Sequence, residues 1–198
     1  NFYPPDIYLV DKNIVSATSI QRLDANPTAS NIVRYAVNFS EPVSGVDAAD
    51  FVFTTTGSLA GLSIGEVSGA GASFVVTVNT GTGDGTLRLD LMDNDTILDT
   101  YSAPLGGLNG GDGSFTSGDV YSLDRTPPTV ITILKLDPDP TAAETVHFSV
   151  IFSEPVKFID VSNFALTANG PTGVMIPELS IDGSTGIVTV STGAGNGT

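Results

Sequence analysis

The chain has 198 residues, with 7 Lys and Arg against 22 Asp and Glu, so its formal net charge at pH 7 is −15. Such a charge excludes a nucleic-acid-binding surface, which needs a basic patch, and it disfavours docking to anionic lipid. The chain has no cysteine and one histidine, His147, which excludes disulfides, thiolate metal sites and sites built from several histidines.

Apolar and polar residues alternate along most of the chain, and helical periodicity is absent, so we expect short β-strands. In chain order the expected strands lie at 14–22, 31–39, 51–56, 62–67, 73–79, 87–91 and 115–123. Residues 40–50 are expected to form a loop, and 92–114 a long glycine-rich loop. Seven short strands in roughly 110 residues predict an all-β fold in which two antiparallel sheets pack face to face, an immunoglobulin-like β-sandwich.

The chain repeats itself at an offset of 113 residues. The segment FSEPV at 39–43 returns at 152–156, and 12 of the 21 positions in 23–43 are identical to those in 136–156. The same offset aligns Asp6-Ile7-Tyr8 with Asp119-Val120-Tyr121. The organisation expected is therefore tandem, with the end of a preceding repeat at 1–13, a full repeat at 14–126, and at 127–198 a second repeat that is incomplete, stopping before its last two strands.

The sequence starts near the end of one repeat and stops partway through another, which predicts that the chain belongs to a longer tandem array. A second explanation is head-to-tail self-assembly, in which the first strand of one copy fills the open edge of the next copy. Two diverged domains in a short protein are a third explanation.

Three segments carry a resemblance to a known class of repeats. Residues 37–43, the linker DRTPPT at 124–129 and GDGTLRLDL at 83–91 resemble the bacterial immunoglobulin-like tandem repeats of large surface proteins. The resemblance covers nearly the whole chain. It implies a stalk, an adhesin shaft, or a building block of a surface layer (S-layer) or filament, with neighbouring repeats of the same protein as partners. It also implies an extracellular protein, on the cell surface or secreted.

Acidic residues are concentrated in the loops and linkers that a seven-strand sandwich brings to one end of each repeat. Crowded carboxylates repel each other, and Ca²⁺ compensates well because it accepts six to eight oxygen ligands. The arrangement resembles the calcium-stiffened junctions of cadherin-like arrays. The candidate metal ligands are Asp11, Glu41, Asp47, Asp50, Asp93, Asp95, Asp99, Asp124, Glu154 and Asp160. The alternative is a solvated acidic surface, with some of these side chains accepting backbone hydrogen bonds.

No residue pattern points to catalysis, so we expect a non-catalytic structural segment. A carboxylate pair suits a glycosidase, but tryptophan is absent and no aromatic platform lies near the acids. We expect His147 to face solvent from a strand. The alternative function is an adhesive module that recognises a carbohydrate or protein receptor through loop 92–114. No apolar stretch approaches the ~20 residues of a membrane span.

Overall fold

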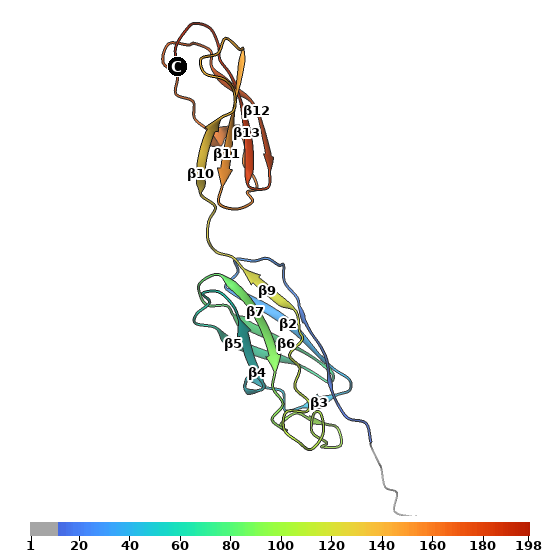
Figure 1. The fold of residues 1–198 in the computed structure, drawn as a ribbon. Helices are drawn as coiled ribbons and strands as arrows, with labels where there is room; N and C mark the ends of the chain where they lie inside the picture. The colour runs from blue at the N-terminus through green and yellow to red at the C-terminus, as the bar shows by residue number, and fades with distance from the viewer. Residues whose placement is uncertain (1–11) are drawn as a thin grey trace, which may run out of the picture. The chain divides into compact units, whose positions relative to one another are not determined.

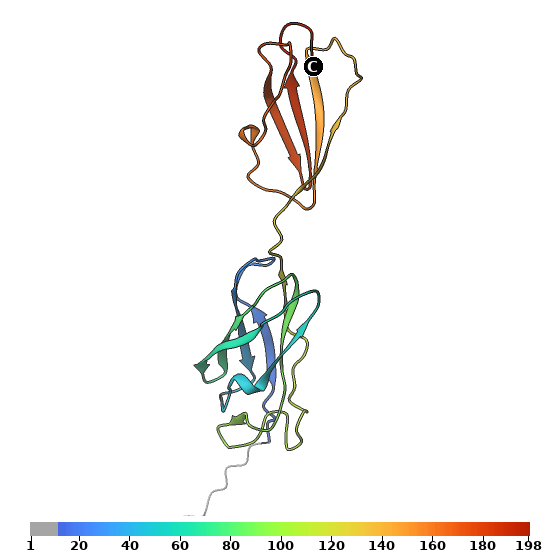
Figure 2. The same ribbon diagram turned by 90° about the vertical axis from the view of Figure 1, so that its left-hand side faces the viewer.

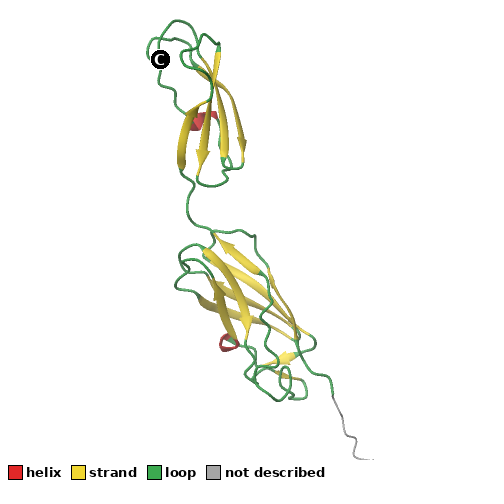
Figure 3. Ribbon diagram, in the orientation of Figure 1, coloured by secondary structure: helices red, strands yellow, loops and turns green. Residues whose placement is uncertain are grey.

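The computed structural model describes residues 12–198 and divides the chain into two compact units, with the boundary between Thr126 and Pro127. The described residues are organised as antiparallel β-sheets (Figure 3). Helical structure in this range is limited to two 3₁₀ turns, η1 (Ala48–Asp50) in unit 1 and η2 (Val161–Asn163) in unit 2. No helix of residues 12–198 is long and apolar enough to cross a membrane. The all-β class expected from the sequence is confirmed.

The first sheet of unit 1 has four antiparallel strands in the order β1-β2-β6-β5 (Figure 1). Their bounds are β1 Ala17–Arg22, β2 Ile32–Phe39, β5 Ser63–Ala70 and β6 Ser73–Asn79. The inward residues of β2 alternate as expected, because successive side chains of a strand point to opposite faces. Val33, Tyr35, Val37 and Phe39 are all buried.

The second sheet of unit 1 has three strands in the order β4-β7-β9. Their bounds are β4 Phe51–Thr55, β7 Gly85–Leu91 and β9 Val120–Leu123. The last strand is shorter than the expected 115–123, and Phe115 forms only an isolated bridge with Leu91. Two short strands that were not expected, β3 (Val43–Ser44) and β8 (Leu98–Asp99), pair with each other inside loops.

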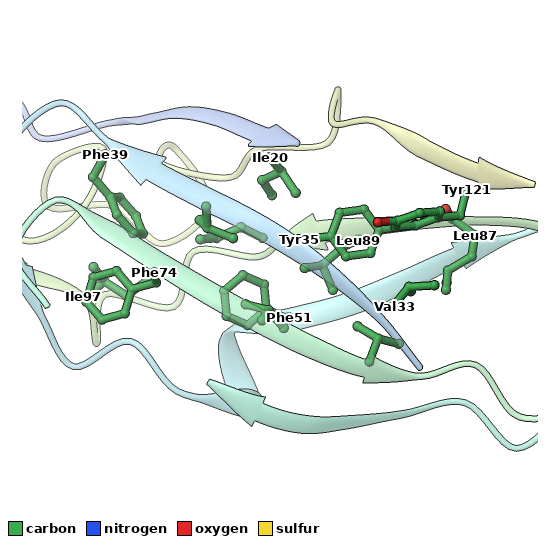
Figure 4. Close-up of a cluster of buried hydrophobic side chains, with 14 of the residues drawn as sticks. Ile20, Val33, Tyr35, Phe39, Phe51, Phe74, Leu87, Leu89, Ile97 and Tyr121 are labelled. Atoms are coloured by element: carbon green, nitrogen blue, oxygen red, sulfur yellow. Dashed lines mark hydrogen bonds between the residues drawn. The ribbon is translucent and has the colours of Figure 1, made fainter. Parts of the chain in front are cut away.

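Side chains from both sheets form one core in unit 1 (Figure 4). The ring of Tyr35 from β2 meets the ring of Tyr121 from β9 edge to face, with 5.1 Å between the centroids. The Tyr35 hydroxyl donates a hydrogen bond to the Leu87 carbonyl of β7 at 2.8 Å, so it links the two sheets. Burial of both inner faces, at roughly 25 cal/mol per Å² of apolar surface, stabilises this sandwich-like arrangement.

Unit 2 contains a single four-stranded sheet in the order β10-β11-β13-β12. The strands are β10 Val130–Lys135, β11 Thr145–Phe152, β12 Met175–Asp182 and β13 Thr185–Ser191. This order repeats that of the first sheet of unit 1. The buried core is small, with four buried apolar residues: Val150, Phe152, Val188 and Val190.

Candidate functional site

Three loops of unit 1 meet at one end of its two sheets, and they hold most of the predicted metal ligands. The backbone N–H of Val43 donates to the Gly71 carbonyl at 3.0 Å, and that of Met92 to the Asp50 carbonyl at 2.8 Å. These bonds join loop 40–50 to the β5–β6 hairpin and to loop 92–114, and Figure 2 shows η1 (cyan) at the same end as this last loop. The residues that we call the acidic loop cluster are Asp47, Asp50, Asp93, Asp95 and Asp99.

Asp47 and Asp50 cap the 3₁₀ turn η1 in a reciprocal capping box. The Asp47 carboxylate accepts from the Ala49 N–H at 2.7 Å, and the Asp50 carboxylate accepts from the Asp47 N–H at 2.8 Å. Asp50 is only 1% exposed, and its second oxygen accepts from the Thr96 hydroxyl at 3.0 Å. Burial raises the pKa of Asp50, although these hydrogen bonds oppose the rise.

Asp93 ties together the two ends of loop 92–114. One carboxylate oxygen accepts from the N–H groups of Gly111 at 3.0 Å and Gly113 at 3.1 Å. The other oxygen accepts from the Asp95 N–H at 3.1 Å. Three backbone donors of a loop that has little regular structure are therefore satisfied by one nearly buried side chain.

Asp99 organises the turn that follows β8. Its Oδ1 accepts from the N–H groups of Tyr101 at 2.7 Å and Ala103 at 2.8 Å. The residue is 4% exposed, and its Oδ2 is buried with no hydrogen-bond partner in the structure. Asp99 therefore accepts backbone hydrogen bonds through one carboxylate oxygen, and its other carboxylate oxygen is buried.

Asp95, the last member of this cluster, and the other described candidates of unit 1 are more exposed than Asp50, Asp93 and Asp99. Asp95 is exposed and has a left-handed backbone, with φ of 64°. Glu41 is half-buried. Asp124 follows β9 and accepts from the Thr126 N–H at 3.2 Å. Asp11 lies outside the described residues.

The two candidates of unit 2 lie in its loop 153–163. Asp160 caps η2 with the same box, in which the Asn163 side chain takes the place of Asp50 and accepts from the Asp160 N–H at 2.9 Å. The hydrogen bond from the Ser162 hydroxyl lowers the pKa of Asp160. Glu154 is half-buried.

Within residues 12–198, no group of three or more His, Asp or Glu side chains could hold a metal ion in this structure. The carboxylates of Asp47, Asp50 and Asp93 instead accept hydrogen bonds within their own loops. Backbone capping, which the sequence analysis left open, is thus a role that these residues have. Calcium binding stays a prediction.

One buried carboxylate was missed by the sequence analysis. Asp90 lies on β7 between the core residues Leu89 and Leu91, so strand alternation places it on the outer face of the sheet, yet it is only 3% exposed. It accepts from the Arg88 guanidinium and from the Thr54 hydroxyl, both at 2.6 Å. The alternation of β7 shows which face Asp90 is on, but not that its neighbours cover it.

The first and last strands of unit 1 are joined by a second group of contacts, which we call the terminal clamp (20–30 and 119–125). The Asp119 N–H donates to the Ile20 carbonyl at 2.9 Å. Thr28 forms a parallel β-bridge with Leu123. The Thr28 N–H donates to the Ser122 carbonyl at 3.0 Å, and the Thr28 carbonyl accepts from the Asp124 N–H at 3.1 Å. The segments that begin and end unit 1 therefore run side by side in the same direction.

Two side chains complete the terminal clamp. The Tyr121 hydroxyl donates to the Arg34 carbonyl at 2.9 Å and accepts from the N–H groups of Leu23 at 3.2 Å and Asp24 at 2.9 Å. The Arg125 guanidinium donates to the carbonyls of Gly83 at 2.6 Å and Ser30 at 3.1 Å.

No protein-family model, curated protein or solved structure matches the chain.

Proposed function

We propose that the chain is a segment of an extracellular stalk or fibre, built from tandem immunoglobulin-like sandwiches, whose role is to bear load. The terminal clamp is the observation that carries this proposal. Force applied at the two ends of unit 1 pulls β1 and β9 in opposite directions, and the segments beside them run parallel. The hydrogen bonds of the clamp are then loaded together, in shear, and cannot open one after another.

The strand order supports the immunoglobulin-like assignment. Without the two-residue strands β3 and β8, unit 1 has seven strands, which we number in chain order. Strands one, two, five and four then form one sheet, and strands three, six and seven form the other. This is the order of constant-type immunoglobulin sandwiches. Unit 2 repeats the order of the four-stranded sheet. In such arrays, the total free energy of unfolding is approximately the sum of the contributions of the individual repeats and of the contacts between neighbouring repeats.

Electron microscopy of the native assembly that contains this chain tests the proposed role. We expect rods or fibres with a regular axial repeat. Dispersed particles that bind a glycan or a protein receptor would contradict a structural role and favour adhesion.

Adhesion through loop 92–114 is the second candidate function, because this loop exposes large side chains. Leu108 is 88% exposed and Tyr101 is 55% exposed. If adhesion is the function, Leu108→Asp and Tyr101→Ala abolish binding to immobilised glycans or host proteins while the melting temperature of unit 1 stays unchanged. If the chain is a stalk, neither the parent nor the variants bind.

Stiffening by calcium stays a prediction within this proposal, and heat unfolding tests it. A specific site stabilises the folded state, so Ca²⁺ is expected to raise the melting temperature relative to EDTA, whereas an equal concentration of Mg²⁺ does so less. Equal melting temperatures in Ca²⁺ and EDTA contradict a specific site and leave the acidic residues with their capping role.

A further inference from the structure

Three Asn-Gly pairs occur in the chain, at 109–110, 169–170 and 196–197. In such a pair the backbone nitrogen of the glycine can attack the side-chain amide of the asparagine, because glycine has no Cβ to obstruct the approach. Glycines are also used where the backbone is left-handed or where another segment passes close by. The structure shows which of the three glycines the fold requires.

The fold requires glycine in the two pairs of unit 2. A Cβ at Gly170 would lie 2.4 Å from the Asn196 carbonyl oxygen, and a Cβ at Gly197 would lie 2.0 Å from the Asn169 carbonyl oxygen. Gly170 also has a left-handed backbone, with φ of 105°. Close packing therefore explains both of these glycines.

The fold does not require glycine at position 110. The φ of Gly110 is not positive, and the nearest atom to a Cβ there would be the Asp95 Oδ2 at 3.6 Å, an ordinary contact. The other glycines of segment 106–113 have either a left-handed backbone or no room for a Cβ: Gly106, Gly107, Gly111 and Gly113. What glycine specifically allows at position 110 is the attack on the preceding asparagine.

The two reacting groups are accessible in the folded chain. Asn109 and Gly110 are both exposed. Within residues 12–198 the Gly110 N–H has no hydrogen-bond acceptor, so no bond has to break before its nitrogen can react. The Asn109 side chain makes one hydrogen bond, from Nδ2 to the Asp112 carboxylate at 3.2 Å.

We propose that Asn109 and Gly110 form a site of spontaneous covalent modification in the folded protein. The Gly110 nitrogen bonds to the side-chain carbonyl carbon of Asn109, and Nδ2 leaves as ammonia, taking up the proton of the Gly110 N–H. Water then opens the resulting cyclic imide at either of its two carbonyls. One opening gives aspartate at position 109. The other gives isoaspartate, in which the main chain runs through the former side chain.

This conversion changes the end of loop 92–114 that Asp93 holds. The Asp112 N–H donates to the Asn109 carbonyl at 3.3 Å, and the Asn109 amide donates to the Asp112 carboxylate. Either product replaces the amide donor by a carboxylate that repels Asp112. Isoaspartate also adds a carbon to the main chain, just before the Gly111 and Gly113 N–H groups that bond to Asp93. We therefore expect the modification to loosen this end of the loop.

Peptide mapping by mass spectrometry tests the site, after prolonged incubation of the folded chain at several pH values. We expect Asn109 to convert, with isoaspartate as the larger product, and faster at higher pH because the attacking nitrogen must lose its proton. Gly110→Ala, for which the fold has room, is expected to slow the conversion about tenfold. Asn94 is the internal control and should stay unmodified, because it is exposed in the same loop but precedes Asp95.

Three outcomes would overturn the proposal. The first is an Asn109 that stays intact in the folded chain while a synthetic peptide of residues 106–113 converts. The second is aspartate without isoaspartate, which would indicate direct hydrolysis of the amide. The third is conversion of Gly110→Ala at the rate of the parent.

Hydrogen exchange tests the consequence for the loop. Anion exchange separates the isoaspartate form, which carries one more negative charge than the parent. We expect the amides of Gly111 and Gly113 to exchange at least about threefold faster in that form. Asn109→Asp, which adds the charge without lengthening the main chain, should show a smaller increase. Equal exchange in the isoaspartate form and the parent would overturn the proposed loosening. Both tests need only a folded unit 1, so they are independent of the proposed fibre role.

Discussion

At the scale of single residues, the acidic side chains of unit 1 stabilise irregular backbone. Asp93 shows this most directly, since one carboxylate accepts from Gly111, Gly113 and Asp95. A loop of this length contains many backbone groups that no strand partner satisfies. Some of the acidic residues therefore order the loops of unit 1, in addition to charging its surface.

Replacing Asp93 by asparagine is expected to lower the free energy of unfolding of unit 1 by about 2 kcal/mol, because charge-assisted acceptance by two oxygens is lost. Asp95→Asn is the matched control: it removes the same charge from an exposed position whose left-handed backbone asparagine tolerates. That variant should change the free energy by less than about 0.5 kcal/mol. Urea unfolding in EDTA measures both, and equal losses would contradict a capping role specific to Asp93.

Asp50 gives a prediction about pH. Burial raises the pKa of Asp50 above its ordinary 3.8, so the folded state binds the proton more tightly than the unfolded state. The contribution of Asp50 to stability is then largest at low pH and falls as the pH rises through the folded pKa. Asp50→Asn lacks this titration and keeps the capping box, as Asn163 does in unit 2.

The stability of Asp50→Asn relative to the parent should therefore increase between about pH 3 and about pH 7. The reciprocal change Asn163→Asp serves as a control, because that position is exposed and carries no burial cost. Thermal melts across this pH range measure both variants. A relative stability that falls with rising pH would contradict the assigned cause.

At the scale of elements, the strands with strict alternation were predictable and the contacts between loops were not. The bounds of β2 and β6 lie within one residue of those expected, because each strand presents an alternating apolar face to a core. The strands β3 and β8 have two residues each, so no period can reveal them. They exist because their loops are brought together by the rest of the fold.

The sequence predicts which acidic residues lie in the candidate site, but not most of the hydrogen bonds that they make. Asp47 and Asp50, three residues apart, have a capping-box spacing that the sequence displays, as do Asp160 and Asn163. The partners of Asp93 lie 18 and 20 residues further along a glycine-rich loop, and nothing local specifies them. The terminal clamp depends on contacts about 100 residues apart, which a single sequence does not encode visibly.

Tyr121→Phe tests the terminal clamp as an element. The change removes one hydroxyl that serves the Arg34 carbonyl and the N–H groups of Leu23 and Asp24. We expect a loss of about 2 kcal/mol in the free energy of unfolding, because three part-buried backbone groups lose a hydrogen-bond partner. Tyr101→Phe, at an exposed position, should change it by less than about 0.5 kcal/mol. Urea midpoints measure both, and a neutral Tyr121→Phe would show that the clamp does not depend on this hydroxyl.

At the scale of the whole molecule, the two units differ in how much apolar surface they bury. The core of unit 1 has 18 buried residues, and that of unit 2 has four. Since burial of apolar side chains is the main favourable term in folding, unit 2 should be the less stable unit.

Hydrogen exchange of the dilute protein checks this difference. We expect amides of β11 and β13 to exchange faster than those of β2 and β6. Equal protection in both sheets at low concentration would contradict the assigned difference in stability.

The proposed mechanical role is tested most directly by stretching single molecules of the full chain between their two ends. We predict a distinct force peak for unit 1, followed by a gain in length of about 350 Å as roughly 110 residues become extended, with a lower peak in Tyr121→Phe than in Tyr101→Phe. Extension of unit 1 without a resolvable peak would show that the parallel contacts between its first and last segments resist no force, and would contradict the account.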